Sequence, residues 1–150
     1  GPALLVADRV TGQLFEIGGD KPMRSGLATK APMGAFRIGE RWAVVLEGAG
    51  NAVVVDLRAE RLEATATIAL GGGVSDAAVS PDGRTLLVAL GGAARERGAS
   101  TAVISGDPPV LAAKLETGLG SHAVSFAPSG EQAVVCATWA RSLAILRPKP

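Results

Sequence analysis

A pattern that recurs at intervals of 44 and 47 residues constrains this chain more than any other feature. Three stretches combine a polar corner with an apolar run: "FRIGERWAVVLE" (36–47), "VSPDGRTLLVAL" (79–90) and "FAPSGEQAVVCA" (126–137). Their corner glycines, which set the spacing, are Gly39, Gly83 and Gly130. The run "ALLVAD" (3–8) matches the apolar strand of an earlier copy. A fixed period in the forties is typical of a repeat architecture, so we expect several copies of one small unit.

Each period also contains further β-rich segments that are separated by short polar breaks. They lie at 12–17, 51–57, 64–70, 75–80, 100–105, 110–118, 121–126 and 142–146. Segments of about five residues bounded by Gly, Pro, Asp and Asn are typical of strands and turns. Helical spacing is not sustained anywhere in the sequence. The pattern therefore predicts four strands in each period.

The corner "SPDGRT" (80–85) has the chemistry of a hairpin turn. Pro81 presets its backbone angle for a turn, and Gly83 tolerates a positive φ. The run "TLLVAL" that follows is apolar at consecutive positions, which favours a sheet covered on both faces. The same reasoning places Trp42, within a strand, in the core.

Four-stranded units of this length that stack around an axis are β-propeller blades. We therefore predict an all-β fold, in which antiparallel four-stranded blades form an incomplete arc of about three to four blades. With 150 residues, the chain has the size of one domain. The blade remnants are expected at 3–30, 31–70, 71–118 and 119–150.

The repeats resemble those of a known family. The stretches "SDAAVSPDGRTLLVAL" (75–90) and "SHAVSFAPSGEQAVVCAT" (121–138) are similar to the repeats of bacterial propellers of the YVTN type, which are close to the WD40-like "SPDG" repeats. Residues 31–70 form a degenerate copy, and the family's tyrosine motif is replaced by "LLVAL" and "AVVCA". The resemblance implies a periplasmic or extracytoplasmic location. Because the family includes both binding proteins and quinoprotein-type enzymes, it implies no single activity.

Composition excludes several classes of function. Lys plus Arg number 15 and Asp plus Glu 14, so no broad field attracts nucleic acid. The sequence contains no run of about 18 apolar residues, so it predicts no membrane-spanning helix. One histidine and one cysteine are too few for a zinc site, and we expect neither a metal nor another cofactor. The single cysteine, Cys136, cannot form an internal disulfide and is expected to be a buried structural thiol.

The repeat count predicts a protein partner. A complete propeller typically has about four to eight blades, and this chain supplies about three and a half. We expect both ends to be unfinished blades that expose a sheet face and strand edges. Two copies could close a ring, another subunit could complete it, or the sequence could be a piece of a longer propeller.

Candidate site residues lie in the loops that are expected to gather around the channel mouth. The longest loop, "GGAARERGA" (91–99), carries Arg95 and Arg97, which suit a carboxylate or phosphate ligand or are simply solubilising. His122 and Asp76 precede or begin inner strands, where a structural hydrogen bond or turn capping is the alternative to ligand binding. Trp139 suits either a partner interface or packing over the adjacent blade.

Two functions follow from these observations. The first is a non-catalytic propeller module for protein–protein or ligand binding and assembly, which completes its fold by association with another chain. No catalytic residue is assigned in that case. The alternative is a subunit or fragment of a propeller enzyme, quinoprotein-like or hydrolytic, with a site at the channel mouth that uses His122, Asp76 and Arg95.

Overall fold

A computed structural model describes residues 3–18, 23–92 and 98–148 of the chain. Within these residues, fourteen strands form four antiparallel sheets, and no helix occurs. We name the sheets A to D in chain order. The predicted all-β fold of antiparallel blades is confirmed.

The two inner sheets have four strands, and the two outer ones have three. Sheet A contains β1 (Leu4–Ala7), β2 (Gln13–Ile17) and β3 (Arg24–Ala28). Sheet B contains β4 (Pro32–Ile38), β5 (Trp42–Glu47), β6 (Asn51–Asp56) and β7 (Ala64–Ala69). Sheet C contains β8 (Asp76–Val79), β9 (Thr85–Leu90), β10 (Ser100–Ser105) and β11 (Val110–Glu116). Sheet D contains β12 (Ser121–Phe126), β13 (Ala133–Ala137) and β14 (Ser142–Leu146).

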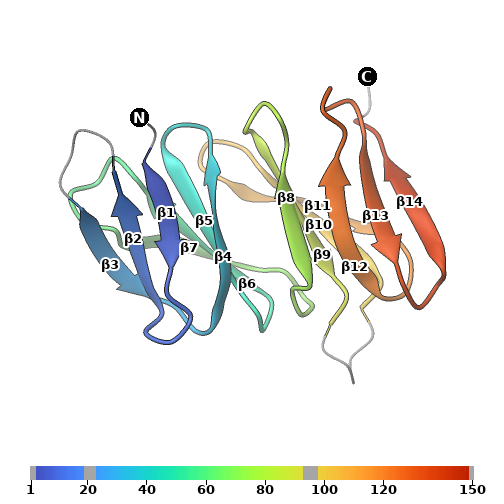
Figure 1. Ribbon diagram of the computed structural model, residues 1–150, viewed down its shortest axis with the longest axis horizontal. Helices are drawn as coiled ribbons and strands as arrows, with labels where there is room; N and C mark the ends of the chain where they lie inside the picture. The colour runs from blue at the N-terminus through green and yellow to red at the C-terminus, as the bar shows by residue number, and fades with distance from the viewer. Residues whose placement is uncertain (1–2, 19–22, 93–97, 149–150) are drawn as a thin grey trace.

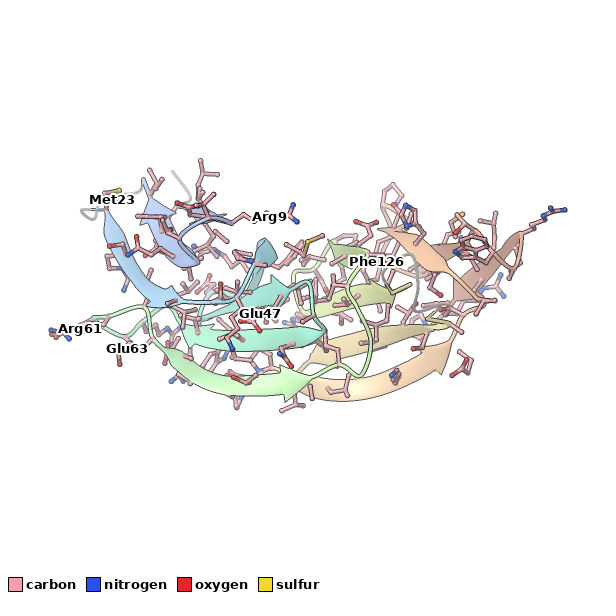
Figure 2. All side chains as sticks on the ribbon, turned by 90° about the horizontal axis from the view of Figure 1, so that it is seen from below. Arg9, Met23, Glu47, Arg61, Glu63 and Phe126 are labelled. Carbon is pink, nitrogen blue, oxygen red and sulfur yellow. The ribbon has the colours of Figure 1, made fainter. Side chains whose placement is uncertain are left out.

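The sheets follow one another in chain order, with sheets A and D at the two ends of the row (Figure 1). Within each sheet, strands that are consecutive in the chain are hydrogen-bonded neighbours. Figure 2 shows that the row bends into an open arc, with β7 and β11 on its outer side. The predicted incomplete arc of blades is therefore confirmed.

Three apolar layers fill the spaces between adjacent sheets. The second strand of each inner sheet contributes to the layers on both of its sides. In β5, Ala43 and Val45 pack toward sheet A, whereas Val44 and Leu46 pack toward sheet C. This arrangement explains the unbroken apolar runs, because both faces of such a strand are covered. Trp42 belongs to the layer between sheets B and C, as predicted.

The polar corner forms the expected turn. Gly83 has a φ of 70°, and its N–H donates to the carbonyl oxygen of Ser80 at 2.8 Å. Asp82 accepts hydrogen bonds from the Ser80 hydroxyl (2.6 Å) and the Arg84 N–H (3.0 Å), and together these donors lower the pKa of Asp82.

Strand β3 and the first half of β4 were not predicted. In β3 ("RSGLA"), Gly26 weakens the strand pattern. A Cβ at this position would lie 2.6 Å from the carbonyl oxygen of Leu62, so close backbone approach requires the glycine. In β4, Pro32 and Gly34 interrupt the pattern in the same way.

Candidate functional site

The loops that were expected to carry the site form a continuous hydrogen-bonded edge from sheet A to sheet D. We call this edge the glycine rim; it comprises residues 8–12, 29–31, 47–51, 70–75, 90–92, 98–99, 117–121 and 138–141. Backbone bonds join successive loops: Leu70 N–H donates to Gly50 (2.8 Å), Gly120 N–H to Gly98 (2.7 Å) and Thr138 N–H to Gly120 (3.0 Å). The rim therefore satisfies many of its own polar groups and ties the blades together.

Asp76, at the start of β8, links two inner strands. Its Oδ2 accepts a hydrogen bond from the Val124 N–H of β12 at 2.9 Å. This bond joins sheets C and D at the inner side of the arc, where the sequence interpretation offered either a ligand or a capped turn. Asp76 thus connects two blades. No local sequence pattern could indicate this role, because Val124 is 48 residues away.

The remaining predicted residues lie at different places. His122 is exposed on β12, the strand adjacent to β8. Trp139 lies in the turn between β13 and β14, is 60% exposed, and packs against the rim at Gly120, where an added Cβ would collide with the indole. The positions of Arg95 and Arg97 lie outside the described residues.

A chain of buried hydroxyl groups supports the rim where the chain passes from sheet C to sheet D. The hydroxyl groups of Thr101 and Thr117 are 2.8 Å apart, and Thr117 Oγ1 lies 2.8 Å from Ser121 Oγ. Ser121 in turn donates to the carbonyl oxygen of Gly118 at 2.9 Å. These residues were not predicted, although Ser100 and Thr101 stand out as polar positions at the start of the apolar segment "STAVIS".

The described residues contain no group of three or more His, Cys, Asp or Glu side chains that could hold a metal ion. Across the same part of the chain, no helix is long and apolar enough to cross a membrane.

Sheet D exposes an apolar face on the side away from sheet C. We call it the D face; its residues are Val134, Cys136, Leu143 and Ile145. They form two cross-strand pairs, Val134 with Ile145 and Cys136 with Leu143. Leu143 is 67% exposed and Ile145 57% exposed. Cys136 is half-buried, so the expectation of a buried thiol is wrong: its strand is covered on one side only.

Sheet A exposes a corresponding face on its side away from sheet B. We call it the A face; its residues are Leu4, Val6, Phe15 and Ile17. Leu4 pairs with Ile17, and Val6 pairs with Phe15. The alternate residues of the same strands, Leu5 and Leu14, pack into the layer against sheet B. Both ends of the arc thus present apolar sheet faces to solvent.

Two hollows lie at the opposite edge of the arc from the glycine rim, where the corner turns lie. One, of about 530 Å³, is lined by Trp42, Arg41 and Asp107 at the junction of sheets B and C. The other, of about 510 Å³, lies between sheets C and D, and we call it the C–D groove. Its lining includes Leu87 from sheet C and Phe126 from sheet D; Phe126 is labelled in Figure 2.

Comparison with known proteins places this geometry in a class. Solved structures that resemble the chain include a β-propeller domain of Cps50 (Swd1) from Myceliophteria thermophila (TM-score 0.71, 13% identity, covering 99% of this chain and 51% of that one). They also include the C-terminal WD40 domain of Sif2 (TM-score 0.63, 15% identity, 99% and 47%). A third is hydrazine synthase from Kuenenia stuttgartiensis (TM-score 0.72, 18% identity, 98% and 43%).

These similarities show that the fold is that of a β-propeller, and one of the similar structures is a WD40 domain. The chain spans about half the length of the structures it matches. No protein-family model matches the chain, and no curated protein matches it. At these identities the likeness extends to the fold and not to the activity.

Proposed function

We propose that this chain is a non-catalytic β-propeller module for binding and assembly, and that another polypeptide completes its fold by covering the A face and the D face. The observation that carries the proposal is the contrast between these faces and their counterparts inside the arc.

The register of the strands identifies those counterparts. In sheet C, Leu87 pairs with Val103, and Ala89 pairs with Thr101, just as Val134 pairs with Ile145 in sheet D. This surface of sheet C is covered by sheet D, and Leu87 is only 4% exposed. The D face repeats the same arrangement, and among the described residues no sheet covers it. Contiguous exposed apolar surface of this kind is typical of an interaction site.

The A face supports the proposal in the same way. Its pair Val6 and Phe15 corresponds to Val45 and Val53 of sheet B, which are buried against sheet A. One end of the arc therefore has the surface that receives a preceding blade, and the other has the surface that receives a following blade. A second copy or a different propeller segment would meet both requirements.

The alternative, a subunit of a propeller enzyme, has less support. Asp76 is engaged with the Val124 N–H, and His122 is exposed on the neighbouring strand. The likeness to hydrazine synthase concerns the fold at 18% identity. We therefore favour the module.

The proposal is tested by measuring the solution mass and the binding of an apolar dye. We expect the wild-type chain either to exceed its monomer mass of 15.0 kDa or to bind the dye strongly. The double variant L143E/I145E places charges on the D face and should reduce whichever of the two signals the wild-type chain gives. V110E is the matched control, because Val110 is an exposed apolar residue on β11, away from both end faces.

A wild-type chain that is a 15.0 kDa monomer and binds no dye would contradict the proposal. Equal effects of L143E/I145E and V110E would also contradict it, since the signals would then come from general surface apolarity.

A further inference from the structure

We propose that the C–D groove binds a small aromatic amine, a planar ring that carries an ammonium group. This inference is independent of the proposed assembly function, because it concerns the space between two sheets of the same chain.

The groove has an apolar interior and a charged mouth. Its apolar lining is contributed by both sheets and includes Leu87, Val103, Leu115, Phe126 and Leu146. The exposed charged residues that line it are Asp82, Glu131 and Arg147. A volume of about 510 Å³ is within the range of about 300–1,000 Å³ that small-molecule pockets occupy.

The junction of sheets B and C shows which kind of side chain fits between two blades at the position that corresponds to the C–D groove. Trp42 is the first residue of β5, and Thr85 is the first residue of β9; both strands have six residues. The last residue of each strand, Glu47 or Leu90, pairs with the first residue of the next strand. Trp42 and Thr85 therefore hold equivalent positions in sheets B and C.

At the junction of sheets B and C, the indole of Trp42 lies in the apolar layer and is held by polar groups. Its Nε1 donates to Asp107 Oδ1 at 2.6 Å, and Arg41 Cζ lies 4.6 Å from the ring centroid. At the junction of sheets C and D, the smaller side chain of Thr85 lines the open groove instead. The groove thus offers, at the position of an indole in the other junction, space for an aromatic ring from a ligand.

The charges at the mouth determine what the ring should carry. Asp82 and Glu131 contribute two negative charges and Arg147 one positive charge, which leaves one net negative charge among the lining residues. Hydrogen bonds from Ser80 and from the Arg84 N–H lower the pKa of Asp82, so its carboxylate is ionised at neutral pH. A cationic substituent complements this mouth, and an anionic one is repelled.

The first test is a calorimetric titration of the wild-type chain with tryptamine, indole and indole-3-acetate. We expect tryptamine to bind with a Kd of about 1 mM or tighter, as befits a fragment-sized ligand. It should bind about tenfold more tightly than indole-3-acetate. The ammonium group can donate a charge-assisted hydrogen bond to a carboxylate at the mouth, whereas the carboxylate of indole-3-acetate cannot, and such a bond contributes at least this factor to the affinity. Absence of tryptamine binding, or equal affinity for the two probes, would overturn the proposal.

Variants locate the binding in the groove. T85W places in sheet C the residue that sheet B already has, and we expect it to weaken tryptamine binding by about tenfold or more by filling the space. T67W is the matched control, since Thr67 is exposed on β7 and lies away from the groove. Unchanged tryptamine affinity in T85W, or an equal loss in T67W, would contradict the assignment.

The variant D82N/E131Q distinguishes the contribution of the charged mouth to the binding affinity from that of the apolar interior. It should reduce the affinity for tryptamine about tenfold and leave the affinity for indole unchanged. Asn at position 82 keeps an acceptor oxygen for Ser80 and Arg84, so the turn is retained. An equal loss for both probes would contradict the role of the charges.

If T85W fails to fold, the wild-type chain supplies an independent readout. Tryptamine should shift the side-chain NMR signals of Phe126 and Leu146, which line the groove, and leave those of Leu4 and Val6 on the A face unchanged. Shifts confined to the A face would overturn the proposal.

Discussion

The two inner sheets and the two end sheets are built from the same repeat but differ in what covers them. Sheets B and C have four strands and an apolar layer on each side, and their second strands are buried almost throughout. Sheets A and D have three strands and one covered face each. A residue in an equivalent position is therefore core in one sheet and surface in another. Sequence similarity between repeats does not imply equal burial.

The largest expected difference in the free energy of unfolding is between two leucine variants, one in an inner sheet and one in an end sheet. We expect L46A to lower the free energy of unfolding by about 2–5 kcal/mol, because Leu46 is 1% exposed between sheets B and C and its truncation leaves a cavity. L143A on the D face should change it by less than about 0.5 kcal/mol. Urea unfolding followed by circular dichroism measures both. A cost for L143A equal to that of L46A would mean that the D face is already covered in solution.

The glycine rim gives the next largest effect. G50A should cost more than about 2 kcal/mol, because Gly50 has a φ of 103° and an added Cβ would collide with the backbone of Gly72. G83A at the polar corner also needs a positive φ, but nothing lies within 4 Å of its added Cβ, so its cost should be about 1 kcal/mol. Thermal unfolding of the two variants provides the comparison. Equal costs would show that the rim is not tightly packed at Gly50.

Trp42 tests the polar anchor of the inner junction. W42F keeps an aromatic ring but removes the donor to Asp107, and we expect a loss of about 1–2 kcal/mol. W139F serves as the control in the β13–β14 turn and should cost less, since Trp139 is largely exposed. Chemical unfolding monitored by the remaining tryptophan measures each variant. If W139F lowered the free energy of unfolding more than W42F does, the expectation that the inner junction contributes more to stability than the end sheet would be wrong.

The smallest predicted effect is a pH dependence at the junction of sheets A and B. Burial works to raise the pKa of Glu16, but hydrogen bonds from Arg24 and then Arg37 outweigh it and hold the pKa below its ordinary value of 4.5. A lowered pKa in the folded state stabilises the protein above pH 4.5, and this contribution is lost as the pH falls through the folded value.

The stability difference between wild type and E16Q should therefore shrink between about pH 5 and about pH 3. We expect its full size to be within about 1 kcal/mol, since ion pairs near the surface contribute little. Thermal unfolding across this range measures the difference. A difference that stays constant would show that the charge of Glu16 contributes nothing to the junction.

Most of the fold could be predicted because the repeat encodes it locally. Pro81 and Gly83 specify the turn, and the consecutive apolar residues of β9 require cover on both faces. Strand β3 could not be predicted from its residues. Gly26 allows the backbone to lie close to the carbonyl oxygen of Leu62, and this contact joins segments that are distant in the sequence.

The candidate site was less accessible to sequence reasoning. Asp76 was identified, but its bond to Val124 depends on how two blades pack. The proposed ligand site in the C–D groove rests on a comparison of Trp42 with Thr85, and the equivalence of these two positions becomes visible only from the register of the strands. Arg95 and Arg97 lie outside the described residues, so their proposed role in ligand binding stays a prediction.

The most direct test of the account uses Cys136, the single cysteine of the chain, which lies on the D face beside Leu143. Its rate of alkylation can be measured alongside the solution mass over a range of protein concentrations. The account predicts ready labelling in the 15.0 kDa monomer and slower labelling in proportion to the associated fraction, with L143E/I145E labelled quickly at every concentration. Association without any change in labelling, or a monomer whose Cys136 is already protected, would contradict the claim that the D face is an open docking surface.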